Sequence, residues 1–289
     1  MPYIYSRRKM KITKYPIVLS IAGSDSSGGA GIQADLKAAS ALGTYAATAI
    51  TAVTVQNTLG VSEVHPVPPQ VVVGQVQAVM NDLQPDALKT GMLYSKEIIN
   101  ALCDVLRSVP HLPPLVCDPV MVSTSGHKLL QDDAIQSMVK ELFPLSSLIT
   151  PNLPEAETVL GRSVQTPEEM EEAARKLLCC GCKAVLLKGG HLSGGRMADY
   201  LLTDTGESKW FEAERTKTSN THGTGCSLSS AIAALLAQGF STVEAVEKAK
   251  AYITQAIEAG AEVEIGSGHG PVNHFFAPIP LIKRPVNTH

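Results

Sequence analysis

The segment from Asn220 to Cys226 has the residue types and spacing best suited to chemistry in this chain. Gly223 and Gly225 predict a tight turn, and an apolar helical pattern follows it directly. A turn that opens a helix points backbone N–H groups at one spot, where the helix dipole adds about half a positive charge. Cys226 stands at the helix start, where the pKa of a thiol is commonly lowered. The segment therefore predicts an anion cradle beside an activated thiol.

Three charged residues each follow a separate apolar run, namely Asp118, Glu155 and Lys188. Two carboxylates at one edge of a sheet could hold Mg²⁺, which favours one or two carboxylates together with phosphates and water. The alternative is that they are surface carboxylates, with Glu155 simply suiting the dipole of a helix that begins at Pro154. Lys188 precedes two glycines, so it could meet a transferred phosphoryl group, although a solvated lysine is the common case.

Two loops suggest a small polar substrate. Residues 22–31 form a glycine-rich loop that lacks the lysine of a Walker loop and the spacing of a dinucleotide site. This loop could approach a substrate closely, with Asp35 accepting a hydrogen bond, or it could be a flexible turn near a solvated aspartate. Gln56 ends an apolar strand, and its amide offers donors and an acceptor together, as an aminopyrimidine edge does. Turn chemistry at a strand end is the alternative for Gln56.

Short β-rich runs alternate with helical patterns along the chain, which predicts a mostly parallel sheet covered on both faces. Ligands bind beyond the carboxyl ends of such strands, where Asp118, Asn152, Lys188 and the Gly223 turn all fall. The expected strands are 17–22, 46–55, 87–90, 115–117, 148–150 and 184–187, with a hairpin of 197–202 and 209–211. The expected helices are 32–42, 68–83, 96–106, 132–142, 167–178, 226–238 and 242–259.

The composition fits one globular domain. The chain has 289 residues, and no linker or repeat divides it, so we expect a single domain over residues 16–289 after a flexible basic tail over residues 1–15. The net charge of −3 gives no reason to expect nucleic acid or membrane partners, and no segment approaches the roughly 20 apolar residues of a membrane span. Cys179, Cys180 and Cys182 lack zinc-site spacing and are interpreted as buried small hydrophobes in a reduced, cytoplasmic protein.

Eight blocks in order carry a family resemblance, at residues 21–35, 56–58, 89–93, 118–121, 150–155, 187–191, 220–226 and 270–275. Together they resemble the hydroxymethylpyrimidine (phosphate) kinases of thiamine biosynthesis, within the ribokinase-like superfamily, over residues 17–276. The resemblance implies an α/β fold, a ribokinase-like three-layer αβα sandwich with a mostly parallel central sheet and a small β-hairpin. It also implies ATP and Mg²⁺ as cofactors and a homodimer, for which the hairpin is one candidate contact surface.

The activity implied by the resemblance is phosphorylation of 4-amino-5-hydroxymethyl-2-methylpyrimidine, and then of its monophosphate to the diphosphate. By position, Gln56 would read the pyrimidine edge, and Met92 and Val120 would flank the ring. Asp35 would approach the hydroxymethyl end, with Gly23 in the substrate-binding loop. The resemblance therefore implies a substrate site built from the first strand, its loop and two later strand ends.

The catalytic roles also follow by position from the resemblance. Cys226 stands where many sugar kinases of the superfamily carry an aspartate base, so its thiolate could take the hydroxyl proton. Lys188 would neutralise the transferring phosphoryl group. The anion hole would be Gly223, Thr224 and Gly225, the Mg²⁺ ligands would be Asp118 and Glu155, and the nucleotide would contact Asn152, Glu155, Lys188 and Thr224.

Three other functions stay open from the sequence. Relatives with a similar site phosphorylate pyridoxal, pyridoxine or pyridoxamine, whose ring also bears a hydroxymethyl group. A non-catalytic pyrimidine-binding sensor would share the substrate pocket but consume no ATP. A cysteine hydrolase would pair Cys226 with His222, although the spacing does not demand that pair.

Overall fold

The computed structural model describes residues 13–123, 126–127, 129–190 and 196–285. Its strands are β1 (Thr13–Lys14), β2 (Ile17–Asp25), β3 (Tyr45–Asn57), β4 (Gly60–Pro66), β5 (Ala87–Thr90), β6 (Leu115–Cys117), β7 (Leu148–Ile149), β8 (Ala184–Lys188), β9 (Arg196–Thr203), β10 (Ser208–Glu214) and β11 (Arg284–Pro285). Its helices are α1 (Gly31–Ala41), α2 (Pro69–Asp82), α3 (Lys96–Arg107), α4 (Asp132–Ser137), α5 (Leu153–Leu160), α6 (Pro167–Leu178), α7 (Thr224–Ala237) and α8 (Thr242–Gly260).

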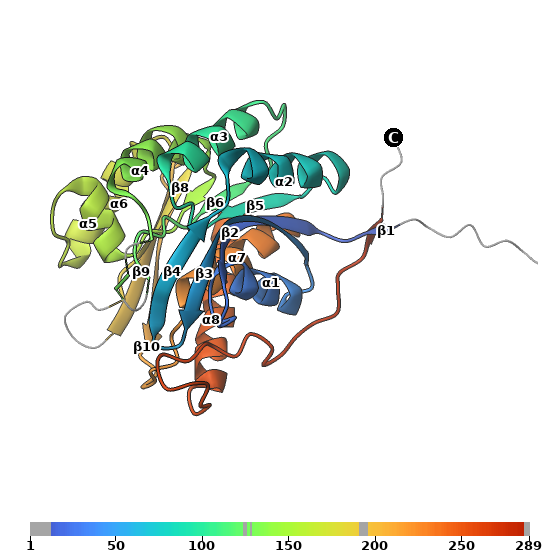
Figure 1. Cartoon of the computed structure of the whole chain (residues 1–289). Coiled ribbons are helices and arrows are strands. Elements are labelled where there is room, and N and C mark those ends of the chain that lie inside the picture. The colour runs from blue at the N-terminus through green and yellow to red at the C-terminus, as the bar shows by residue number, and fades with distance from the viewer. Residues whose placement is uncertain (1–12, 124–125, 128, 191–195, 286–289) are drawn as a thin grey trace, which may run out of the picture.

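One nine-stranded sheet organises the described part of the chain, in the order β10-β9-β8-β7-β6-β5-β2-β3-β4 (Figure 1). The six strands from β8 to β3 run parallel, and β4, β9 and β10 are antiparallel additions at the two edges. The expected α/β alternation is therefore confirmed. Because the parallel strands end at the same edge, the loops that follow them meet there.

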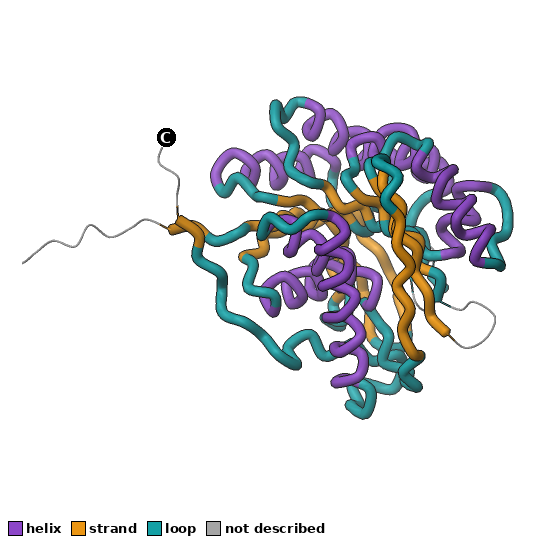
Figure 2. Tube along the Cα trace, turned by 180° about the vertical axis from the view of Figure 1, so that it is seen from behind, coloured by secondary structure: helices purple, strands orange, loops and turns teal. Residues whose placement is uncertain are grey.

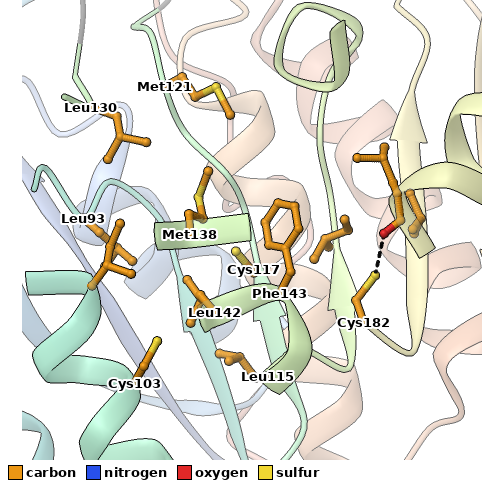
Figure 3. Close-up of a cluster of buried hydrophobic side chains, with 14 of the residues drawn as sticks. Leu93, Cys103, Leu115, Cys117, Met121, Leu130, Met138, Leu142, Phe143 and Cys182 are labelled. Carbon is orange, nitrogen blue, oxygen red and sulfur yellow. Dashed lines mark hydrogen bonds between the residues drawn. The ribbon is translucent and has the colours of Figure 1, made fainter. Parts of the chain in front are cut away.

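Helices cover both faces of the sheet and make it the middle of three layers. Helices α2 to α6 pack on one face, and α1, α7 and α8 pack on the other (Figures 1 and 2). Successive side chains of a strand point to opposite faces, so Leu115 and Cys117 join the first core and Val116 joins the second. Figure 3 shows part of the first core, where Phe143 and Leu142 lie beside Cys117. The three-layer αβα architecture is confirmed.

The expected elements differ from the structure at their ends and edges. Strand β4 was not expected, because its residues lie half exposed on an edge and carry little apolar periodicity. The expected helix 132–142 is α4 followed by a π-helical turn over Met138–Leu142. The hairpin is present and longer than expected, as β9 and β10. Cys179 is exposed where α6 ends and Cys180 is half-buried, so the expectation that three neighbouring cysteines are buried is confirmed only for Cys182.

Two residues of the expected tail over residues 1–15 form a strand. Thr13–Lys14 form β1, which pairs with β11 in a short ribbon beside the body of the molecule (Figures 1 and 2). Asp86 holds this ribbon in place, because its carboxylate accepts from Lys14 Nζ at 3.1 Å and from Arg284 at 2.7 Å. Residues 1–12 of the expected tail lie outside the described residues. Among the described helices, none has the length and apolar character needed to cross a bilayer.

His274 makes the stability of this fold depend on pH. Its side chain is buried, its Nε2 lies 2.8 Å from Ser227 Oγ, and burial together with Lys37 lowers its pKa to about 4. Between pH 6.5 and 4 the unfolded chain therefore binds more protons than the folded chain at this residue. We expect acidification through that window to remove up to about 3 kcal/mol of stability, as measured by urea unfolding.

The variant His274→Asn should show a smaller loss of stability between pH 7.5 and pH 5 than the unmodified protein. His65 is exposed, and His65→Asn provides the matched control. An unchanged pH dependence in His274→Asn would show that another group causes the acid loss.

Candidate active site

A pocket of about 430 Å³ opens at the carboxyl edge of the parallel strands. The loops after β2, β5, β6, β7 and β8 and the start of α7 contribute to its wall. All of the expected site residues except Asp35 line it, namely Gly23, Gln56, Met92, Asp118, Val120, Asn152, Glu155, Lys188, Gly223, Thr224, Gly225 and Cys226. Segments up to 200 residues apart in sequence thus meet at the place that the strand ends predict.

The start of α7 forms the anion cradle, and a glycine is sterically required at Gly223. Gly223 has φ of 77°, and a Cβ there would collide with the carbonyl oxygen of Gly29. A Cβ on Gly225 would lie 3.3 Å from Lys188 Nζ. Thr224 turns both its N–H, at 3.2 Å, and its hydroxyl, at 2.8 Å, to the Thr221 carbonyl. The N–H of Thr224 is thus engaged, and anion contacts from this turn fall to its neighbouring backbone N–H groups at the start of α7.

Lys188 and Asp118 form a buried ion pair next to the cradle. Lys188 Nζ lies 3.0 Å from Asp118 Oδ1, and Thr150 donates to the same oxygen at 3.2 Å. Burial opposes the charge of Lys188, but the Asp118 and Glu155 carboxylates outweigh it and raise the pKa of the lysine. Lys188 is thus a fixed cation at the rim of the anion cradle.

Glu155 has two roles, because it caps α5 and faces the pocket. Its carboxylate accepts the Asn152 N–H at 2.8 Å, and Asn152 Oδ1 accepts the Glu155 N–H at 2.8 Å, which is a capping box. Burial raises the pKa of Glu155 to about 7, Lys188 opposes this rise, and the Asp118 carboxylate adds to it. The Asp118 charge thus disfavours ionisation of Glu155. A divalent cation bound by both carboxylates would relieve this repulsion, so the two form a suitable donor set.

Cys226 faces the pocket, but its thiol is not activated as expected. The N–H of Gly31 donates to the sulfur, and the Lys89 ammonium also favours the thiolate. Burial outweighs both and raises the pKa of Cys226 to about 11, with Asp35 and Asp118 adding to the rise. The expectation of a lowered pKa is wrong here, because desolvation at this helix start exceeds the effect of the dipole.

Asp35 lies beneath the pocket rather than on its wall. Its carboxylate accepts from Lys89 Nζ at 2.9 Å on both oxygens, from Ser230 at 2.7 Å, and from Ser20. The expected direct contact between Asp35 and the hydroxymethyl end of a substrate does not fit this geometry, since Asp35 is buried and its oxygens are engaged. Lys89 lines the pocket in its place, and sequence reasoning missed it. The signal was a lysine inside an otherwise apolar strand, where a buried charge needs a partner.

Gln56 is oriented by a network that the sequence did not reveal. His222 Nε2 lies 2.8 Å from Asp25 Oδ2 and 3.3 Å from Gln56 Nε2. Burial favours the neutral form of Asp25, but hydrogen bonds from His222, Ser27 and Ala30 outweigh it and lower the pKa of Asp25 to about 2. Asp25 is therefore an anion, and the Nε2–H of His222 donates to it. Gln56 Oε1 accepts from the Thr54 hydroxyl at 3.1 Å, so the Gln56 amide is held between Thr54 and His222. His222 is thus engaged by Asp25 rather than Cys226, which gives no support to a cysteine hydrolase.

The comparisons with known proteins agree with this geometry. The phosphomethylpyrimidine kinase family model matches residues 25–273. The chain is 50% identical over 260 residues to a hydroxymethylpyrimidine/phosphomethylpyrimidine kinase of Rhizobium meliloti (strain 1021), covering 90% of this chain and 97% of that protein. It is 45% identical to the kinase of the same description from Escherichia coli (strain K12), covering 90% and 97%.

Two solved structures are similar over most of the chain. A phosphomethylpyrimidine kinase from Clostridium difficile 630 has a TM-score of 0.74 and 44% identity, covering 83% of this chain and 99% of that one. An ADP complex of Bacillus subtilis pyridoxal kinase has a TM-score of 0.82 and 35% identity, covering 90% and 98%. The ribokinase-like fold is thereby confirmed.

Proposed function

Because the chain belongs to the phosphomethylpyrimidine kinase family, we propose that it phosphorylates 4-amino-5-hydroxymethyl-2-methylpyrimidine and then its monophosphate, with ATP as donor, in thiamine diphosphate biosynthesis. The observation that carries the proposal is the convergence of the α7 cradle, the Lys188–Asp118 pair and Cys226 in one pocket. Phosphoryl transfer depends mainly on positioning and on stabilising charge, and these residues supply both.

In the first reaction, the hydroxymethyl oxygen attacks the γ-phosphorus of ATP. The new O–P bond forms, the bond to the ADP oxygen breaks, and the hydroxyl proton passes to the thiolate form of Cys226, which the thiol gives by losing its own proton to solvent beforehand. Lys188 and the backbone N–H groups at the start of α7 lie where they stabilise the phosphoryl oxygens. Gln56, Met92 and Val120 hold the ring, with the Gln56 amide turned by His222.

Asn152, Glu155, Lys188 and Thr224 form the proposed nucleotide side of the pocket. Asn152 uses its Oδ1 to cap α5, so a nucleotide contact falls to its Nδ2 group. Asp118 and Glu155 would hold Mg²⁺ directly or through water, and the bound ion would neutralise phosphate charge. The structure fits this role, because both carboxylates line the pocket and the Asp118 charge adds to the rise in the pKa of Glu155, which a bound cation would oppose.

We further propose a homodimer that works in the cytoplasm. Val53 and Val55 lie two residues apart on β3 and so share a face, and both are exposed, as is Leu59 in the next turn. This apolar patch favours β3–β4 over the β9–β10 hairpin as the surface that meets a second copy. Light scattering of the full chain tests the assembly.

All six cysteines are free thiols, which suits a reducing compartment such as the cytoplasm.

A coupled ADP-release assay tests the function across three acceptors: the pyrimidine alcohol, its monophosphate and pyridoxal. The high structural similarity to a pyridoxal kinase is the observation that keeps vitamin B6 as a second candidate acceptor. We expect turnover of both pyrimidines, with pyridoxal slower. A reaction faster with pyridoxal than with either pyrimidine would reassign the substrate, and the absence of ADP release with every one of the three acceptors would reject the kinase assignment.

A further inference from the structure

Lys89 is the second cation of the pocket, and it is tied to the helix that carries Cys226. Its side chain is fully buried in β5, and its Nζ lies 2.9 Å from both oxygens of Asp35. Asp35 in turn accepts from Ser230 Oγ at 2.7 Å. Ser230 is four residues after Cys226 on α7, so the two share a helix face. A chain of one lysine, one aspartate and one serine therefore fixes Lys89 on the side of α7 that carries Cys226.

The same arrangement occurs on the neighbouring face of α7. Lys188 pairs with Asp118 at 3.0 Å, and Ser229 Oγ lies 3.3 Å from the second oxygen of Asp118. Ser229 is four residues after Gly225, whose missing side chain leaves room for Lys188. Two consecutive serines of α7 thus each hold one lysine–aspartate pair. Ser229 contacts the Lys188–Asp118 pair on the helix face of Gly225, and Ser230 contacts the Lys89–Asp35 pair on the helix face of Cys226. The proposed function gives a role to Lys188 but none to Lys89.

The charges around the sulfur make Lys89 significant. Burial disfavours the Lys89 ammonium, but Asp35, Cys226 and Asp118 outweigh burial and raise its pKa, so it is a permanent cation. Lys89 is also the largest influence that lowers the pKa of Cys226 against burial. The groups that face the sulfur are Lys89 on β5, Asp35 and the Gly31 N–H on α1, Asp118 after β6, and Lys188 on β8.

We propose that Lys89 is a positioning residue of the first phosphorylation. Its buried ammonium, which Asp35 holds on the Cys226 side of α7, supplies the positive charge that a proton-accepting sulfur needs. The inference rests on the proposed function, in which the substrate hydroxyl gives its proton to that sulfur and its oxygen bonds to the transferred phosphorus. Lys89 neither gains nor loses a proton in this step. It stabilises the thiolate before the proton arrives.

The test measures iodoacetamide alkylation of each cysteine at pH 9.5, by peptide mass spectrometry on the full chain without ligands. Well below the pKa of Cys226, its alkylation rate follows the thiolate fraction, and one pKa unit is tenfold in that fraction. We expect Lys89→Met to slow alkylation of Cys226 by about tenfold or more, because an opposite charge at close range shifts a pKa by about 1–3 units. Exposed Cys179 should react at its usual rate.

If Lys89 had only a structural role, its replacement would make alkylation of Cys226 faster rather than slower. A loosened site would expose Cys226 and speed its alkylation, together with the core thiols Cys103, Cys117 and Cys182 (Figure 3). If Lys89→Met does not fold, the neutral pair Lys89→Met/Asp35→Asn replaces it, and Cys226 should still react more slowly than in the unmodified protein. Lys250→Met, which breaks another Lys–Asp ion pair at 2.7 Å, is the matched control and should leave the Cys226 rate unchanged.

An unchanged or faster Cys226 rate in a folded Lys89 variant overturns the proposal. Because alkylation needs neither ATP nor pyrimidine, this result is independent of the ADP-release assay. A slowed Cys226 in a protein that never phosphorylates a pyrimidine would leave the electrostatic pair standing and reject the kinase function. In an active enzyme, Lys89→Met should also reduce kcat for the alcohol more than for the monophosphate, a split that general loss of folding does not produce.

Discussion

Replacing Cys226 by alanine is expected to slow phosphorylation of the pyrimidine alcohol by about 10²- to 10⁴-fold, the range for losing a well-placed base. Phosphorylation of the monophosphate should fall much less. The acceptor in that second step is a phosphate oxygen that is already anionic near neutral pH, so no proton has to be removed. The measurement is kcat for each acceptor separately, at saturating ATP and with purified protein.

The pH dependence of the first step gives this prediction a second readout. Because the pKa of Cys226 is about 11, the thiolate fraction rises about tenfold per pH unit below that value. The unmodified enzyme should therefore gain rate with the alcohol as pH rises from 7 to 9, and Cys226→Ala should lose that slope. Cys179→Ala removes an exposed thiol outside the pocket and serves as the control. Equal losses in both phosphorylations would count against Cys226 as the base.

The parts of the site that follow from backbone geometry could be predicted from the sequence. Gly223 is required by a left-handed turn that packs on Gly29, and Gly225 leaves space beside Lys188, so glycines stand at a fixed spacing here. Asp118 comes directly after the apolar strand β6 and Lys188 is the last residue of the apolar strand β8, and parallel strands end at one edge. Local patterns therefore placed these four residues in one pocket without tertiary information.

The parts that depend on burial and on long-range pairing could not be predicted. Asp35 and Lys89 are 54 residues apart, and nothing in the local pattern around either shows that they neutralise each other. The pKa of Cys226 is set by desolvation, which only the packed structure determines. The same holds for the orientation of Gln56, which depends on His222 from a loop 166 residues later.

Lys188→Met should impair both phosphorylations, each by about 10³-fold, which is the effect expected for losing a charge that stabilises the transferring group. The reason for equal loss is that the γ-phosphoryl group is the same in both reactions, whichever acceptor attacks it. Lys188 lies against Gly225 at the cradle and not against the residues proposed to hold the ring. KM for either pyrimidine should therefore change little while kcat falls.

An equal loss in the two phosphorylations distinguishes Lys188 from Cys226 and Lys89, which are proposed to matter mainly when a hydroxyl proton is removed. Lys183 lies just before the same strand, is exposed, and gives the matched control Lys183→Met, which should keep full activity. Removing Lys188 also leaves Asp118 without its cation, so circular dichroism and urea unfolding must show that the variant is folded. The double variant Lys188→Met/Asp118→Asn removes both charges of the pair and serves as the folding control: it should unfold in urea like the unmodified protein and stay inactive, because Asp118 is also a proposed Mg²⁺ ligand. A loss confined to the alcohol would instead place Lys188 with Cys226 and Lys89 in handling the hydroxyl proton.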